Sequence, residues 1–241
     1  MAIIKDFGIV LREYDAGENN KKLVLLTQNS GKIAVFARGS KRIGSKLADN
    51  LFCYSEYIIY DGGSFFSLNQ LSPIRRFNGI AEDLDSYCVA CYFLEIVDSM
   101  ILPNMETADI LTIILRGLHE LSIQRLSAQA IFATFTFKFL QMEGFAPLFD
   151  GCMYCEKQLG GNIWLLSDGL VCDECWALHS YKGVRLSEQT KSALEYILTA
   201  EYESIFAYRA SAGVQEELYR CARWFLATNI EFDLKSLLML Q

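Results

Sequence analysis

Four cysteines constrain this chain more than any other feature of its sequence. The stretch GCMYCEKQLGGNIWLLSDGLVCDEC, residues 151–175, holds two Cys-x-x-Cys pairs with sixteen residues between them. Two residues between paired cysteines let one tight turn aim both sulfurs at the same ion. The segment NIWLLSDGLVC predicts a hairpin, with an Asp-Gly turn at Asp168 and Gly169, that returns the second pair beside the first. The spacing therefore predicts a zinc-ribbon-like module with the ligands Cys152, Cys155, Cys172 and Cys175.

Four thiolates fill the coordination of a tetrahedral ion and leave no position for water or substrate, so the predicted site is structural rather than catalytic. The alternatives are two unrelated pairs of buried cysteines and a redox pair, which needs a Cys-x-x-Cys at a strand-to-helix corner. His179 is an alternative ligand. Cys88 and Cys91 form a further Cys-x-x-Cys, but they lie on the apolar face of a predicted helix, where cysteine behaves as a small apolar residue.

The composition favours a globular protein of the cytoplasm. About half of the 241 residues are apolar (52%), which is enough for a sizeable core. No uncharged apolar run reaches the roughly 18 residues of a membrane helix, and Lys5 and Asp6 interrupt any secretory signal. In a reducing compartment, metal binding or burial explains the eight cysteines better than disulfides do.

The hydrophobic pattern predicts an α+β multidomain protein. Period-two runs rich in β-branched and aromatic residues predict five short strands, at residues 3–14, 22–29, 32–38, 51–60 and 65–74. A long first strand, and a longer connection after the third, favour a five-stranded OB-fold barrel, with an SH3-like barrel as the alternative. After Pro73 the period changes to 3.6 and predicts helices at 80–101, 106–121, 127–144, 188–200 and 214–230.

Local signals refine these helices. The first is expected to bury Leu84, Tyr87, Cys88, Cys91, Leu94 and Ile101. The third is apolar nearly all round, which predicts a central position in a bundle, with Gly144 as its C-terminal cap. Ser187 is the expected N-cap of the fourth. The predicted domains are an OB-fold, DNA-binding domain at 1–78, a helical domain at 79–149 and 181–241, and the four-cysteine zinc module inserted at 150–180.

Positive charge gathers in the first third of the chain. The formal net charge is -7, yet residues 1–80 carry 11 Lys/Arg against 7 Asp/Glu, whereas residues 81–241 carry 11 against 22. The stretch ARGSKRIGSK combines cations with glycines that let a backbone approach phosphates. Phe36 is expected on the exposed face of its strand, where bases of single-stranded DNA can stack. The predicted DNA-binding residues are Arg38, Lys41, Arg42, Lys46 and Phe36, extended by Lys21, Lys22, Arg75 and Arg76; a solvated basic loop is the alternative.

The sequence contains no nucleophile elbow, phosphate loop or histidine-containing metal motif, and has only two histidines. We therefore expect no enzymatic activity and no catalytic residue. A zinc hydrolase is disfavoured by the four-thiolate site. A protein–protein adaptor with little intrinsic DNA binding remains the main alternative to a DNA-binding protein.

Taken together, these segments resemble the RecO family of bacterial recombination mediators. The resemblance covers nearly the whole chain and is carried by the opening GIVLREYDAGENNKKLVLLTQNSGKIAVFARGSKRIGSKLADNLFCYSEY, by FTFKFLQMEGFAPLFDGCMYC, by SDGLVCDEC and by the terminal LKSLLML. It implies an OB-fold domain, a helical domain and a structural Zn2+ held by the four cysteines. It also places Arg38, Lys41, Arg42 and Lys46 on the DNA-binding surface.

The resemblance further implies a cytoplasmic, nucleoid-associated role in DNA repair. A member of the family binds single- and double-stranded DNA, anneals complementary strands and, with its partner RecR, helps load RecA onto DNA coated by single-strand-binding protein. The acidic tail of single-strand-binding protein and RecR are the implied protein partners. The basic loop here is less densely cationic than is common in the family, which leaves the intrinsic DNA affinity open.

Overall fold

The computed structural model describes residues 2–40, 51–103, 105–179, 182–231 and 233–240. The chain packs into two units, Met1–Ile123 with Leu234–Gln241, and Gln124–Asp233. Among the described residues, no helix combines the length and the apolar character needed to cross a membrane. The predicted domain boundaries at residues 78, 149 and 180 stay predictions.

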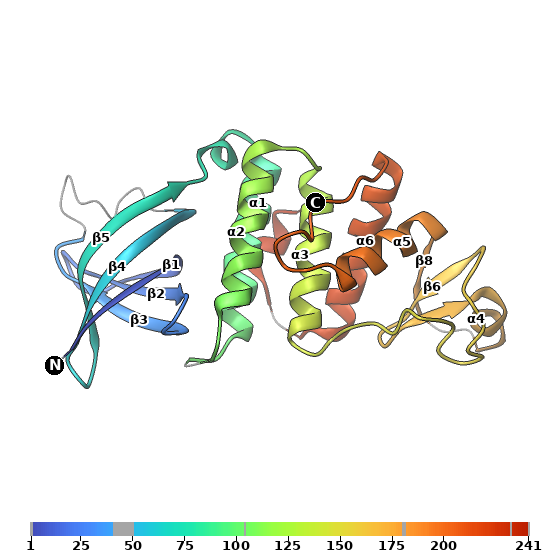
Figure 1. Cartoon of the computed structure of the whole chain (residues 1–241), viewed down its shortest axis with the longest axis horizontal. Coiled ribbons are helices and arrows are strands. Elements are labelled where there is room, and N and C mark those ends of the chain that lie inside the picture. Colours follow the sequence, from blue (N-terminus) through green and yellow to red (C-terminus); the bar gives the residue numbers. More distant parts are fainter. Residues whose placement is uncertain (1, 41–50, 104, 180–181, 232, 241) are drawn as a thin grey trace. The chain divides into compact units, whose positions relative to one another are not determined.

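The first unit begins with a closed five-stranded barrel, as predicted (Figure 1). Its strands are β1 (Ala2–Asp15), β2 (Lys21–Thr27), β3 (Lys32–Ala37), β4 (Cys53–Asp61) and β5 (Phe66–Arg76). The order around the barrel is β1-β2-β3-β5-β4, with β4 returning to β1 and only the β3–β5 pair parallel. This is the OB-fold arrangement.

Strand β1 closes the barrel because it pairs with both β4 and β2. Its first half pairs with β4 and its second half with β2, and Gly8 lies where the two ladders meet. A Cβ atom at Gly8 would lie 2.1 Å from the carbonyl oxygen of Leu26, so only glycine permits this close approach of two strands.

Asp6 of β1 fixes the turn between β2 and β3. Its fully buried carboxylate accepts hydrogen bonds from Phe7 N (2.8 Å), from Ser30 N and Oγ (2.8 and 2.7 Å) and from Asn29 Nδ2 (2.9 Å). Burial alone raises the pKa of a carboxyl group, but these hydrogen bonds, led by the Ser30 hydroxyl, outweigh it and lower the pKa of Asp6. The turn is therefore held in place by an ionised carboxylate.

The barrel core follows the period of two in the strands. Along β3, Ile33, Val35 and Ala37 are buried, whereas Ala34 and Arg38 are exposed and Phe36 is half-buried. The inward residues form one apolar cluster: Val10, Leu23, Leu25, Ile33, Val35, Ala37, Tyr57, Ile59 and Leu71. The predicted alternation around Phe36 is confirmed.

The first unit continues with helices. A 3-10 helix, η1 (Asn78–Glu82), precedes α1 (Leu84–Met100) and α2 (Ala108–Ile123), and the 3-10 helix η2 (Lys235–Leu238) packs on α1 from the end of the chain. Asp98 of α1 joins helix and barrel by accepting from Arg12 Nε and Lys32 Nζ, both at 2.9 Å. Lys32, a cation of the barrel, is thus neutralised by an ion pair within the first unit.

The predicted face of α1 is partly wrong. Leu84, expected inside, is 75% exposed, whereas Phe93 and Val97, outside the predicted stripe, are buried. Four elements, namely β1, η1, α2 and η2, pack against α1, so its buried surface is wider than one helical stripe.

In the second unit, α3 (Ala128–Met142) packs against α5 (Glu188–Thr199) and α6 (Ala212–Asn229). Residues Ala130–Leu140 of α3 are all buried, which confirms the predicted central position. The cap at Gly144 is also confirmed, because Gly144 N donates to Gln141 O and Phe145 N to Leu140 O, the pattern of a Schellman motif. Ser187 caps α5 as predicted, accepting from Thr190 N at 3.2 Å.

In the sequence, the segment between α3 and α5 forms a small three-stranded sheet in the order β7-β6-β8. Its strands are β6 (Ile163–Leu165), β7 (Leu170–Cys172) and β8 (Val184–Leu186), and the short helix α4 (Asp173–His179) follows β7. Strands β6 and β7 form the predicted hairpin.

Candidate metal centre and nucleic-acid interface

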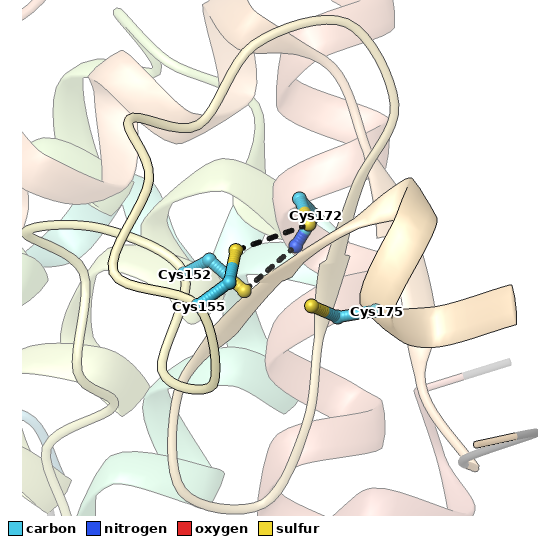
Figure 2. A group of neighbouring side chains, drawn as sticks. All are labelled: Cys152, Cys155, Cys172 and Cys175. Carbon is cyan, nitrogen blue, oxygen red and sulfur yellow. Dashed lines mark hydrogen bonds between the residues drawn. The ribbon is translucent and has the colours of Figure 1, made fainter. Parts of the chain in front are cut away.

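Two local structures position the four cysteines. Cys152 and Cys155 lie on one turn, in which Glu156 N donates to Cys152 O (2.8 Å). Cys172 ends β7, and Cys175 lies in the first turn of α4. Met153 N donates to Leu170 O (3.0 Å), which fastens the first turn to β7. Figure 2 shows all four side chains converging.

The sulfur geometry fits a tetrahedral metal ion. All four sulfurs lie within 4.8 Å of one another, and the Sγ atoms of Cys155 and Cys172 are 3.8 Å apart. Metal–sulfur bonds of about 2.3 Å in a tetrahedron separate sulfurs by about 3.8 Å. The eight cysteines of the chain are free thiols. These four can therefore hold one metal ion, as the spacing predicted.

The thiols of this cluster differ sharply in acidity. Burial opposes ionisation of Cys152, but hydrogen bonds from backbone N–H groups, that of Cys155 first, lower the pKa of Cys152 to about 6. Burial and the neighbouring thiols raise the pKa of Cys175 to about 12. One thiolate forms readily, and its charge opposes the next; a bound cation removes that conflict.

The buried cluster next to the four cysteines is small. It consists of Cys152, Leu166, Val171 and Cys175, so two of four members are candidate ligands. Trp164 of β6 and Trp176 of α4 stack beside it with ring centroids 3.7 Å apart and planes 3° apart. The cysteines thus make up part of the packing around the site, in addition to the buried strand residues Ile163, Leu165 and Leu170.

The hairpin turn differs in detail from its prediction. Leu166 N donates to Gly169 O (2.9 Å), so Ser167 and Asp168 form the turn, one residue earlier than expected. Gly169 serves another purpose: it pairs with Leu148, and a Cβ there would lie 2.9 Å from the Cβ and the oxygen of Leu148. The glycine is required for this close approach.

A cationic and aromatic surface lies on the outer face of the barrel. Lys22 of β2 is directly opposite Phe36 of β3 on one side and Tyr14 of β1 on the other. Because Leu23 and Val35 point into the core, these three residues share the outer face. We call Tyr14, Lys22, Phe36 and Arg38 the barrel face.

A cleft of about 490 Å³ adjoins this surface. Lys22 and Ile33 line it, together with Phe65 at the end of the β4–β5 loop and Phe66 at the start of β5. Phe65 is 56% exposed. From the sequence, Phe65 was assigned only to a strand. The feature that could have indicated a binding role was the aromatic pair Phe65 and Phe66 directly after the turn sequence DGGS. Strands 2–3 and the β4–β5 loop are where OB-folds bind oligonucleotides.

The remaining predicted cations have different surroundings. Arg38 is exposed after β3, and Gly39 N donates to Asn20 Oδ1 (2.9 Å), which ties the start of the basic stretch to the β1–β2 loop. Lys21 is paired with Glu13. Lys41, Arg42 and Lys46 lie outside the described residues, so their role stays a prediction.

Arg75 and Arg76 lie elsewhere on the barrel. Both are exposed at the end of β5, opposite Tyr54 and Cys53 of β4. Arg75 lies eight positions along β5 from Ser67, the partner of Phe36, which is on the order of 25 Å at about 3.3 Å per residue. The structure therefore does not join them to the barrel face, and it brings Arg75 to His119 of α2 instead, at 2.8 Å.

A closed OB-fold barrel followed by helices, with a four-cysteine cluster that can hold a metal, defines an α+β multidomain protein. Two family models match it: "Recombination protein O N terminal" over residues 1–77 and "Recombination protein O C terminal" over residues 81–238. The chain belongs to the RecO family, and this membership supports a role in DNA repair and recombination.

Individual relatives agree. The chain is 29% identical to the DNA repair protein RecO of Acetivibrio thermocellus over 96% of its own length and 93% of the relative's. It is 28% identical to the DNA repair protein RecO of Clostridium kluyveri, over 98% and 93% of the two lengths. With the protein of the same name from Alkaliphilus metalliredigens, identity is 26% over 95% and 94%.

Proposed function

We propose that this protein is a non-enzymatic recombination mediator that binds single- and double-stranded DNA through the barrel and anneals complementary strands. The observation that carries the proposal is the barrel face beside an aromatic cleft, at the position where OB-folds bind oligonucleotides. Family membership adds the DNA-repair setting.

The barrel face and the adjoining cleft supply the two kinds of contact that an unpaired strand needs. Phe36 and Phe65 offer rings on which bases stack, each for about 1–3 kcal/mol. Lys22 and Arg38 are exposed cations for phosphates, and Lys41, Arg42 and Lys46 follow Arg38 in the sequence as further cations. These contacts do not depend on base sequence, which suits a protein that must accept any strand.

Annealing follows from binding and requires no nucleotide hydrolysis. Cations that neutralise phosphates reduce the repulsion between two strands, and bases displayed on the barrel face remain able to pair. We further propose, on the strength of the family resemblance, that RecR and the acidic tail of single-strand-binding protein are partners. With them the protein helps load RecA onto coated DNA in the cytoplasm.

We propose Zn2+ as the ion of the cysteine cluster, with Cys152, Cys155, Cys172 and Cys175 as its ligands. Tetrahedral sulfur coordination is the usual structural site of zinc. The ion would join the Cys152–Cys155 turn to the end of β7 and the start of α4. Its role would be to stabilise the fold of the module.

The test is single-strand binding measured against salt concentration. If about four cations each neutralise one phosphate, log K falls with log salt at a slope near -2.8, or about -0.7 per phosphate. Charge reversal of Arg38, Lys41 and Arg42 should abolish annealing while zinc content and fold persist. The matched control reverses three exposed cations outside the barrel, Lys182, Arg209 and Lys235, and should leave annealing intact.

A protein–protein adaptor is the second candidate. It is favoured by exposed apolar side chains on the cysteine module, namely Tyr154 and Leu178, and by the exposed Leu148, which pairs with Gly169 of the module. The adaptor predicts no measurable strand binding at low salt, with RecR absent or present. Binding with the salt slope above contradicts it.

A further inference from the structure

A second cleft in the first unit carries a separate set of cations. It has a volume of about 400 Å³ and lies between α2 and the part of the barrel where β4 begins and β5 ends. Arg75, Arg116 and His119 line it, together with Tyr54, Ile74 and Phe77. None of its lining residues is acidic, although the whole protein has a net charge of -7.

The contacts of Arg75 leave its charge available. Its Nη2 donates to His119 Nδ1 at 2.8 Å. A guanidinium has only donors, so Nδ1 accepts and His119 is the neutral tautomer with its proton on Nε2. Arg75 also lies over the Phe77 ring, 5.0 Å from its centroid. These two neutral partners orient the guanidinium without cancelling its charge.

Arg116 adds a second cation from α2, where it is exposed. Among the residues that the structure describes, no carboxylate lies within salt-bridge distance of either arginine. Ile74, 54% exposed, provides an apolar wall. Two planar cations beside an apolar and aromatic wall suit a chain that alternates phosphates with flat bases, since guanidinium planes bind phosphates and also stack on bases.

We propose that this cleft is a second binding site for single-stranded DNA, so that one chain holds two strands at once. The inference rests on the proposed function, and it explains why Arg75 lies on the order of 25 Å along β5 from the barrel face. Annealing brings two strands together, and two separate sites on one chain would hold both strands without direct competition.

The test compares two double variants. Arg75→Ala/Arg116→Ala should keep the affinity for a first oligonucleotide within about two-fold but weaken the second by about ten-fold or more. The salt slope of second-strand binding should shrink by about 1.4, for two lost phosphate contacts. Lys22→Ala/Phe36→Ala should instead weaken the binding of the first oligonucleotide. Native mass spectrometry with two non-complementary oligonucleotides counts strands per chain, and annealing rates are measured in parallel.

The matched control is Arg209→Ala/Lys235→Ala, which removes the same charge at exposed sites outside the cleft and should leave two strands bound. If Arg75→Ala/Arg116→Ala still binds two strands per chain, the second site is wrong. If the natural protein binds one strand only, through the barrel face, this inference alone fails; if it binds none, the proposed function fails too. A short acidic peptide that binds the cleft more tightly than DNA would overturn the assigned ligand class.

Discussion

The barrel and the cysteine module differ in what stabilises their folds. Nine apolar residues fill the barrel, and its five strands close on themselves, so its ladder of hydrogen bonds has no open edge. The module has strands of three residues each and a buried cluster in which two of four members are cysteines. The barrel is stabilised by its core, whereas we propose that the module is stabilised largely by the ion that its four sulfurs can hold.

The largest effect should come from removing one sulfur. Cys172→Ser should abolish stoichiometric metal binding and unfold the module locally, at a cost of about 5 kcal/mol or more, because metal binding contributes about 10–16 kcal/mol in isolated zinc-finger peptides. Hydrogen exchange should rise across β6, β7 and α4 and stay unchanged in β1–β5. Cys91→Ser, a half-buried cysteine of the other Cys-x-x-Cys, is the control. Full stability of a metal-free Cys172→Ser protein would contradict the view that an ion stabilises the module.

The converse change belongs to the barrel. Leu25 is fully buried in its core, and Leu25→Ala should destabilise the barrel by about 2–5 kcal/mol. Metal content and exchange rates of the module should be unaffected. Loss of the metal together with the barrel, measured by metal analysis of the folded fraction, would show that the two regions unfold as one.

The smallest effect concerns the Asp6 carboxylate. Because its pKa is lowered in the folded state, its contribution is fully present above the unfolded value of about 3.9 and is lost as pH falls through the folded value. Asp6→Asn should cost about 1–3 kcal/mol at pH 7, and the difference from the natural protein should shrink in acid. Exchange of the amides at the β2–β3 turn measures this. Glu18→Gln, exposed in the β1–β2 loop, is the control, and an equal cost at pH 3 would contradict the explanation.

The features that the sequence predicted well are local ones. The five strands, to within two residues at each end, the Ser187 and Gly144 caps and the convergence of the four cysteines each depend on a few neighbouring residues, and these were confirmed. The face of α1 was predicted only in part because packing partners such as β1 and η2, distant in sequence, widened it, as the burial of Phe93 and Val97 shows. Nothing near Lys32 indicated that Asp98 would pair with it. Nothing near Arg75 indicated His119, since that contact depends on how α2 packs against the barrel.

The stacked Trp164 and Trp176 give the module its own optical probe. Indoles 3.7 Å apart interact electronically, and Trp176 directly follows Cys175, so their spacing depends on the position of that sulfur. Trp224, in α6, completes the three tryptophans and supplies a constant background. Intrinsic fluorescence and near-ultraviolet circular dichroism should therefore follow ion uptake and loss in unlabelled protein, in real time.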